Sequence, residues 1–412
     1  MSTRRPGKPV PARNGDGGGN RGSTRIAKPG DNDDEVRPVN LALQGGGSHG
    51  AFSWGVLDAL LEDGRIGFEA VTGASAGAIN AVVMADGWRR GAPAGDARAG
   101  ARAALRRFWT DIGREPSPFA YAAAWPWSSS AFAQGAGWFG PWAGLGSAPG
   151  APGAGPFSAV KDAFTDALSV NPVALWLDLV SRVLSPYQLN PLNINPLRRV
   201  VGQHVDFDAL RAAPPFKLFL TATNVRTGRP RIFREGELTL DMALASACLP
   251  SVFQAVAIEG EGGVGHYWDG GYMGNPALWP LFHATRSNDL LLVQINPLTR
   301  DEVPDSAQEI TERVNEISFN ASLLHEMRAI EFVQRLLAEK RIDPARYKRV
   351  LLHMIAAEEQ MRAYGASSKY NTAPAFLNEL FDLGRRTARH WLDDHIDYVG
   401  HAGTVRIAEK FL

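Results

Sequence analysis

Cysteine is almost absent from this sequence, in which Cys248 is the only one among 412 residues. A single thiol excludes an intramolecular disulfide and any cysteine-based metal site. Neither sign of charge predominates, because 43 Lys and Arg residues balance 43 Asp and Glu residues. Without a basic excess the chain has no global field for nucleic acid, and we expect no nucleic-acid partner.

A long hydrophobic run is also lacking. No stretch of about 18 consecutive apolar residues occurs that could span a bilayer. The N-terminal region has no apolar core of a secretory signal peptide. We therefore expect a cytoplasmic protein, with peripheral contact to a membrane left open.

Large apolar side chains are scarce in the first 38 residues. Residues 1–28 hold seven Lys and Arg against one acidic residue, Asp16, among many Gly and Pro. Such a composition cannot form a packed core, so it predicts a disordered tail over residues 1–38. Its basic charge fits either contact with anionic lipid or a solvated linker.

Glycine, in contrast, is plentiful and occurs in patterns. Gly73 and Gly77 flank Ser75 in a Gly-x-Ser-x-Gly motif, between a predicted strand at 66–71 and a predicted helix at 76–85. A serine raised on such a strand-to-helix turn is a candidate nucleophile. Its backbone is strained, and glycine two positions away on each side avoids collision with the strand and the helix. A plain glycine-rich turn is the alternative, since five residues often match by chance.

A second glycine run, Gly45-Gly46-Gly47, follows an earlier predicted strand at 39–44 and precedes a predicted helix. Backbone N–H groups at a helix N-terminus have no intrahelical partner and carry the positive end of the helix dipole. Such a loop is suited to hold a developing oxyanion. The alternative is a nucleotide phosphate loop, but no Gly-Lys-Ser/Thr follows and the Gly-x-Gly-x-x-Gly spacing is missing.

These two segments together resemble the patatin-like phospholipase family, whose members pair a glycine-rich oxyanion loop with a Gly-x-Ser-x-Gly turn. Asp269-Gly270-Gly271 is similar to the family's Asp-Gly-Gly/Ala motif, and Ala245–Pro250 is similar to the small-residue helix end that precedes that motif. The resemblance covers roughly residues 39–296. Three motifs in the same order make it specific.

The resemblance implies a Ser–Asp dyad, with Ser75 as nucleophile and Asp269 as base. It also implies an oxyanion hole made by the amides of Gly45, Gly46 and Gly47. One position departs from the family, which usually has Arg or Lys before the last glycine of this loop, Gly50, where the present chain has His49. A permanent charge is thus replaced by a titratable one.

A Ser-His-Asp triad remains open beside the dyad, because a serine hydroxyl needs a base. Six histidines follow in the chain order that an α/β-hydrolase triad would require, although none lies in a distinctive motif: His283, His325, His353, His390, His395 and His401. The resemblance favours the dyad. Asp269 itself, in a loop with an Asp-Gly pair, has an ordinary turn residue as its alternative interpretation.

The inferred reaction is hydrolysis of an acyl ester through an acyl-Ser75 intermediate, which Asp269 resolves by activating water. This chemistry requires no metal and no organic cofactor. The family implies a lipid substrate, foremost a glycerophospholipid. A soluble esterase, thioesterase or acyltransferase is the alternative, and a non-catalytic lipid-binding protein is a further one. Head group, chain length and oligomeric state have no signature in the sequence.

Strands that alternate with helices predict an α/β fold with a mainly parallel sheet. The resemblance implies a three-layer α/β/α arrangement with additional C-terminal helices. We expect a catalytic domain over residues 39–300 and a mainly helical C-terminal extension over 301–412, packed on that domain. Residues 116–156 form a Gly-, Pro- and Trp-rich insertion, which fits either a packed loop or a lipid-contacting flap.

Overall fold

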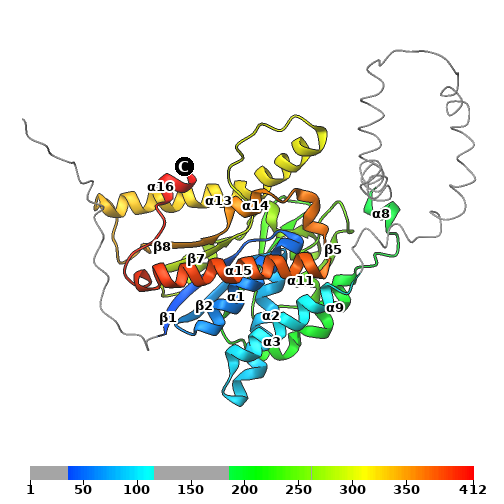
Figure 1. The fold of residues 1–412 in the computed structure, drawn as a ribbon, viewed down its shortest axis with the longest axis horizontal. Helices are drawn as coiled ribbons and strands as arrows, with labels where there is room; N and C mark the ends of the chain where they lie inside the picture. The colour runs from blue at the N-terminus through cyan, green and yellow to red at the C-terminus, as the bar shows by residue number, and fades with distance from the viewer. Residues whose placement is uncertain (1–35, 116–184, 261) are drawn as a thin grey trace, which may run out of the picture. The chain divides into compact units, whose positions relative to one another are not determined.

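The computed structural model describes residues 36–115, 185–260 and 262–412 (Figure 1). The insertion at 116–156 and nearly all of the tail at 1–38 lie outside these described residues. The flap and the disordered tail therefore stay predictions. Within the described residues, no helix is long and apolar enough to cross a bilayer.

The described residues form one eight-stranded sheet with the order β5-β6-β3-β2-β1-β7-β8, in which β4 also pairs with β3. Pairs between β1, β2, β3, β7 and β8 are parallel, whereas β4, β5 and β6 add antiparallel pairs. The strands are β1 (Arg37–Leu43), β2 (Ile66–Ala74), β3 (Lys217–Asn224), β4 (Pro230–Arg234), β5 (Val256–Gly260), β6 (Gly263–Asp269), β7 (Asp289–Gln294) and β8 (Leu351–Ala356).

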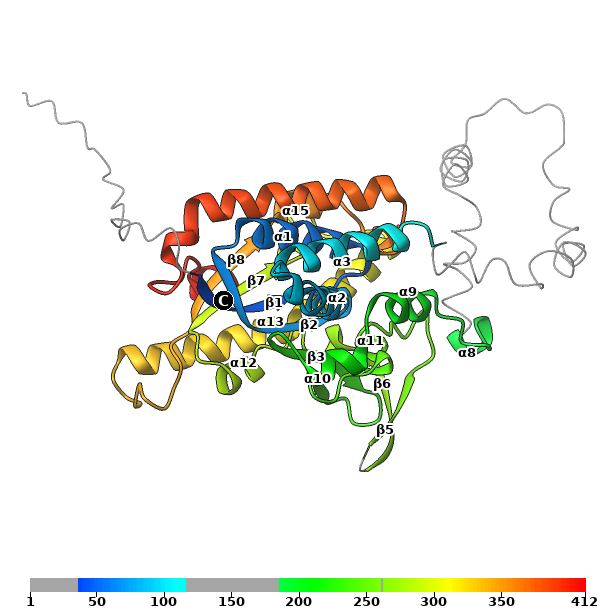
Figure 2. The same cartoon turned by 90° about the horizontal axis from the view of Figure 1, so that it is seen from below.

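Helices cover both faces of this sheet (Figure 2). One hydrophobic core joins the sheet to α1, α2, α3 and α15, and a second core on the other face joins it to α12, α13 and α16. The helices are α1 (Gly50–Asp63), α2 (Ala76–Gly91), α3 (Ala97–Ile112), α8 (Pro186–Leu189), α9 (Pro196–His204), α10 (Phe207–Ala212), α11 (Leu240–Ser246), α12 (Trp279–Ala284), α13 (Ala307–Ala338), α14 (Glu358–Arg362), α15 (Pro374–His395) and α16 (Ile407–Phe411). The predicted α/β fold with a mainly parallel sheet is thus confirmed.

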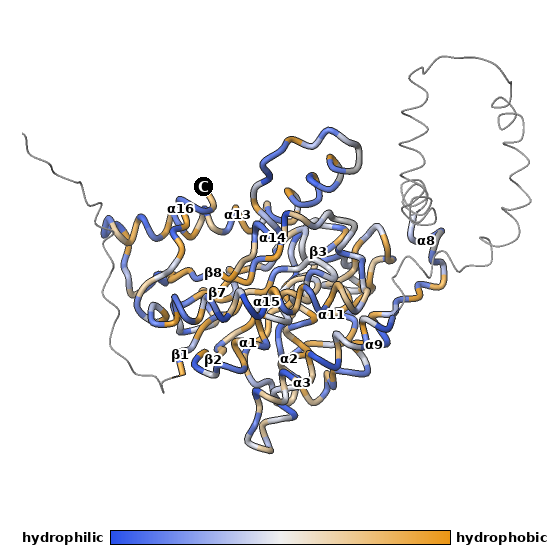
Figure 3. Tube along the Cα trace, in the orientation of Figure 1, coloured by the Kyte–Doolittle hydropathy of each residue, from blue (hydrophilic) through white to orange (hydrophobic). Residues whose placement is uncertain are grey.

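Strand β7 is buried along its whole length, and the apolar run at 290–293 in its centre is typical of a strand covered on both faces. Figure 3 shows the hydrophobic character of the central strands and of α1. Strand β8 pairs with β7 over Asp289–Gln294. The segment after residue 300 therefore contributes a strand to this same sheet in addition to its helices.

Helix α1 lies between the sheet and α15, and almost all of its residues are buried. Two glycines bring α1 and α15 together: a Cβ on Gly55 would collide with the Phe381 carbonyl oxygen, and a Cβ on Gly384 would collide with the Phe52 carbonyl oxygen. The backbones consequently cross in direct contact. Because α1 follows the glycine loop directly, this crossing fixes the position of the loop as well.

Candidate active site

Ser75 lies on the sharp turn between β2 and α2, with φ 53° and ψ −127°. Positive φ is uncommon for a residue with a Cβ and marks a strained turn. The turn is tight on every side: a Cβ on Gly73 would lie 2.6 Å from Gly77 C, and a Cβ on Gly45 would lie 2.5 Å from Ser75 Cβ. The glycines of both motifs are therefore required by close packing around the serine.

The register of β3 brings Asp269 to this serine. Strand β3 pairs with β2 as far as Thr221 opposite Ala74, and with β6 from Ala222 opposite Asp269 onward. Because β4 overlaps both pairings, it must occupy the other edge of β3. Strands β2 and β6 therefore lie end to end on one edge, and Ser75 and Asp269 occupy their facing ends.

The Asp269 carboxyl is fully buried. Its Oδ1 accepts a hydrogen bond of 2.7 Å from the Gly271 amide. Among the described residues, no group donates a hydrogen bond of good distance and angle to its Oδ2. The Ser75 hydroxyl is nevertheless near enough to lower the pKa of this carboxyl. Burial is the larger effect and raises the pKa of Asp269 to about 7, against the lowering effects of Ser75, Gly271 and Lys369. A carboxyl with a pKa near neutrality is suited to proton transfer.

The end of α11 and the residues just after it accept hydrogen bonds from the backbone amides of Ser75 and Asp269. The Ser75 amide donates to Ser246 O at 3.0 Å and to Ser246 Oγ at 3.2 Å. The same hydroxyl donates to Thr221 O at 2.6 Å. Two residues further on, Cys248 O accepts a hydrogen bond of 2.7 Å from the Asp269 amide. The small-residue segment at 245–250 is thus a clamp on the two candidate catalytic residues.

In the glycine loop, side chains hold Gly45 at both its amide and its carbonyl, and the next two amides are free of hydrogen bonds among the described residues. The Gly45 amide donates to Asn275 Oδ1 at 2.6 Å, and Gly45 O accepts from Asn296 Nδ2 at 2.8 Å. Among the hydrogen bonds of the described residues, none is donated by the amides of Gly46 or Gly47. The loop leads directly into α1, so these two amides lie at the positive end of a helix.

His49 is buried at the start of α1, and its Nε2 lies 2.7 Å from Ser368 Oγ. Its ring packs near Tyr364 and Phe376, with centroids 5.9 and 6.2 Å away. Burial, and to a smaller extent the charge of Lys369, lowers the pKa of His49 to about 3. The imidazole is therefore neutral at physiological pH and carries none of the charge that an Arg or Lys would bring.

We predict that His49→Gln leaves the pH dependence of activity unchanged between pH 5 and 9. A histidine with a pKa of about 3 does not titrate in that range. Steady-state rates of wild type and His49→Gln across this range measure the effect. A limb that disappears in the variant would mean that the imidazole is charged after all.

The Asp-Gly-Gly loop is packed as tightly as the turn that carries Ser75. A Cβ on Gly270 would collide with Thr221 O, and a Cβ on Gly271 would collide with the Phe319 ring. On the other side of the site, a Cβ on Gly50 would lie 2.6 Å from Ala76 Cβ. Gly270 and Gly271 therefore let the loop approach β3 and α13, and Gly50 lets α1 approach the first residue of α2.

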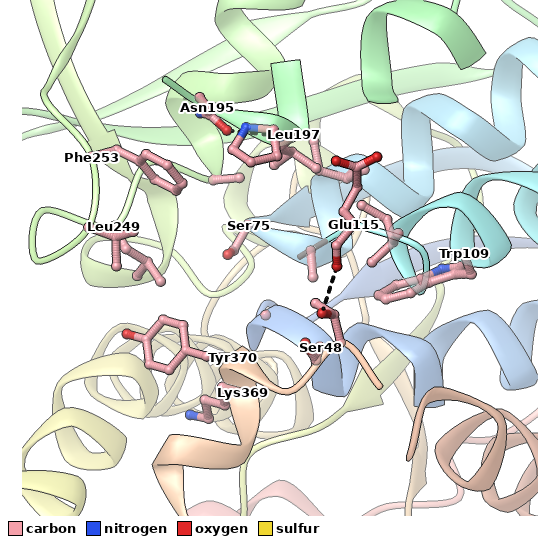
Figure 4. A pocket seen from close by; sticks show the side chains of 18 of the residues that line it. Ser48, Ser75, Trp109, Glu115, Asn195, Leu197, Leu249, Phe253, Lys369 and Tyr370 are labelled. Atoms are coloured by element: carbon pink, nitrogen blue, oxygen red, sulfur yellow. Dashed lines mark hydrogen bonds between the residues drawn. The ribbon is translucent and has the colours of Figure 1, made fainter. Parts of the chain in front are cut away.

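A cavity of about 150 Å³ opens above Ser75. Figure 4 shows Leu249 and Phe253 on one side of the serine, with Tyr370 below Leu249, and Trp109 on the other side. Most of the remaining wall is also apolar, and it includes Ile79, Phe108, Ile112, Leu197, Ala247 and Val252. An apolar cavity that ends at a candidate nucleophile is suited to an acyl chain.

None of the six histidines eligible for a triad lines this cavity. The fully buried one, His353, binds Asp289 Oδ1 at 3.0 Å at the beginning of β7, whereas Ser75 follows the end of β2. Parallel strands place these positions at opposite edges of the sheet. Across residues 36–115, 185–260 and 262–412, no three His, Cys, Asp or Glu side chains gather as a metal site requires.

Several residues around the site have no signature in the sequence. Asn275 and Asn296 hold the glycine loop, and Lys369 and Tyr370 line the cavity from a 3-10 helix, η6 (Ala366–Tyr370). Asn296 follows the end of β7, next to β1. The rule that carboxyl ends of parallel strands meet could have identified it, but no comparable rule points to η6.

The model of the family described as Patatin-like phospholipase matches residues 41–282, which is more than half of the chain. The chain belongs to the patatin-like phospholipase family. A search of curated proteins gave no match. The match to the family model includes the glycine loop, the Ser75 turn and the Asp269 loop of this patatin-like protein, and it ends within α12.

Two solved structures are similar to this patatin-like chain. VipD from Legionella pneumophila shares 15% identity with a TM-score of 0.38, over 87% of this chain and 67% of that chain. A chain of the heterodimeric ExoU–SpcU complex, from the type III secretion system of Pseudomonas aeruginosa, shares 16% identity with a TM-score of 0.31, over 87% of this chain. The alignment spans 52%, about half, of that second protein.

Proposed function

We propose that this protein is a serine acyl hydrolase of the phospholipase A type, which cleaves acyl esters of lipids. The observation that supports this most directly is the pair of facing strand ends that carries Ser75 and Asp269 beneath an apolar cavity. Membership of the family supports a lipid substrate. A glycerophospholipid is the substrate class we propose.

In the proposed first step, Ser75 Oγ attacks the ester carbonyl carbon while Asp269 takes the hydroxyl proton. The negative charge that forms on the carbonyl oxygen is stabilised by the amides of Gly46 and Gly47 and by the helix that follows them. Gly45 completes the loop, with its own amide occupied by Asn275. The intermediate collapses as Asp269 returns the proton to the leaving alkoxide, which gives an alcohol or a lysolipid.

In the second step, Asp269 takes a proton from water, and the resulting hydroxide attacks acyl-Ser75. The tetrahedral intermediate again rests on the glycine amides. Its collapse releases the fatty acid and returns the proton to Ser75 Oγ. The raised pKa of Asp269 keeps its proton affinity close to what both transfers need near neutral pH.

A fluorophosphonate probe tests this function. We expect stoichiometric labelling of wild-type protein at Ser75, no labelling of Ser75→Ala, and release of fatty acid from phospholipid vesicles by wild type alone. Ser53→Ala is the control, because Ser53 Oγ is buried on α1, has no hydrogen-bond partner among the described residues and lies outside the cavity. It should label like wild type.

The substrates in this experiment separate the alternatives. Hydrolysis of short soluble esters without release of fatty acid from vesicles would assign a soluble esterase. Absence of both labelling and hydrolysis in folded wild-type protein would contradict a serine hydrolase and favour a binding role.

A further inference from the structure

Lys369 contacts the glycine loop from a position 87 residues beyond the family match, since it lies at position 369 and the match ends at 282. Its Nζ donates to Asn296 Oδ1 at 2.8 Å. The same amide donates through Nδ2 to Gly45 O at 2.8 Å. One side chain therefore links the ammonium to the loop, and Lys369 also lines the cavity above Ser75 (Figure 4).

The ammonium is not neutralised by a direct ion pair. Among the salt bridges of the described residues, none within 4.0 Å includes Lys369, and its Nζ lies 5.7 Å from the centre of the Phe319 ring. Glu316, the nearest carboxylate in electrostatic effect, already pairs with Arg300 and Arg313. A cation partly removed from water is costly to retain, and this burial lowers the pKa of Lys369.

The same 3-10 helix accounts for the neutral histidine. Ser368 Oγ contacts His49 Nε2. A Cβ on Gly47 would collide with the carbonyl oxygen of Lys369. Helix η6 therefore packs directly on the loop. It covers the position where the family usually carries a positive charge and brings a positive charge of its own.

We propose that Lys369 is a positioning residue that supplies the charge missing from the glycine loop. Through Asn296 it fixes the carbonyl of Gly45, and its ammonium favours the negative charge that Asp269 carries as a base and that the oxyanion acquires. This inference rests on the proposed function, because it assigns Lys369 to the Ser75 and Asp269 site.

Lys369 is the charged group that acts on the pKa of Asp269, because the other titratable groups near Asp269 are uncharged near neutral pH. Burial, and secondarily the negative charge of Asp269, raises the pKa of Tyr272, and the same two effects raise the pKa of Cys248 to about 12. Tyr370 also has a raised pKa, chiefly through burial. These groups stay uncharged between pH 5 and 9. Four charged residues act on Lys369 itself. Glu312 and Glu316 belong to α13, Arg300 lies in the loop that follows β7, and Asp269 is the last residue of β6.

Lys369→Gln removes the charge but keeps a hydrogen-bond donor at the end of a side chain that is one bond shorter than that of Lys. We expect kcat/KM on a short soluble ester to fall by up to about 100-fold. We also expect its acidic limb to move to higher pH, since Asp269 loses the cation that lowers its pKa. Lys369→Arg, which keeps a permanent charge, should recover most of the activity and leave the acidic limb in place.

The alkaline side gives a second readout. Because burial lowers the pKa of Lys369, wild-type kcat/KM should decline at alkaline pH as the ammonium loses its proton, and Lys369→Arg should lack this decline. An acidic limb at the same pH in wild type and Lys369→Gln would overturn the proposal, as would equal losses in Lys369→Gln and Lys369→Arg. If wild type shows no Ser75 labelling or hydrolysis, the proposed function itself has failed. Circular dichroism of each variant distinguishes loss of fold from loss of charge.

Discussion

Asp269→Asn is expected to lower kcat by about 10⁴-fold while the chain stays folded. An amide has the shape of the carboxyl and can still accept the Gly271 hydrogen bond, but it cannot take a proton from Ser75. The loss therefore measures the base alone. Rates on a lipid ester and on a short ester should fall together, because the proton transfer is common to both.

The double variant Ser75→Ala/Asp269→Asn provides the control for this prediction. Residues that act as a unit are not additive, so the double variant should be no slower than either single variant. Full activity in Asp269→Asn would contradict the dyad. Loss of activity on changing one downstream histidine alone would point to a triad instead.

The single variant Asp269→Asn should be more stable than wild type at alkaline pH. Since the pKa of Asp269 is raised from 3.8 to about 7 in the folded chain, the folded state binds the proton more tightly than the unfolded state. Wild-type stability is then lost as pH rises from about 4 to 7, by at most about 4 kcal/mol at 1.36 kcal/mol per pKa unit. Asp269→Asn avoids this cost, so denaturant unfolding should separate the two proteins at pH 8 and not at pH 4.

Gly77→Ala should lower the free energy of unfolding by about 3 kcal/mol or more. A Cβ at this position would collide with Leu43 O and would lie 2.8 Å from Gln44 O. Both atoms belong to the backbone around the end of β1 and cannot rotate away. Alanine in a helix normally gains about 1 kcal/mol over glycine, so the collision must outweigh that gain. Urea unfolding of the variant measures the difference.

Gly202→Ala is the matched control, because Gly202 is also a helical glycine. Its added Cβ would meet one atom, Leu240 Cδ2, at 3.3 Å, and that methyl group belongs to a flexible side chain. We expect a stability that is unchanged or raised by up to about 1 kcal/mol. Equal destabilisation in both variants would show that the crowding at Gly77 is not the cause.

The fold class and the family could be predicted because their signals are local. Strand β7 is an apolar run, and Ser75 and Asp269 each lie in a short motif. The sequence could not provide the register of β3, which alone makes Ser75 and Asp269 neighbours. That register depends on where β2 and β6 pair with β3, and these two strands lie far from β3 in the chain and leave no local pattern.

The electrostatics of the site were equally out of reach. His49 could be charged or neutral until its burial beneath η6 was known. Lys369 lies in Ser367-Ser368-Lys369-Tyr370, a run of residues typical of any polar loop. Its distance to Asn296 is a product of the whole topology, because it requires β7, β8 and η6 to be placed together.

The backbone contact between α1 and α15 shows that the region matched by the family model is not the same as the region that folds as one unit. The family model matches residues 41–282. A fragment cut there would leave Phe52 and Trp54 without Phe381, which packs on Trp54 with ring centroids 4.0 Å apart. It would also lack β7 beside β1. The homologous region is thus shorter than the unit that folds, and expression of that fragment alone should yield aggregated protein.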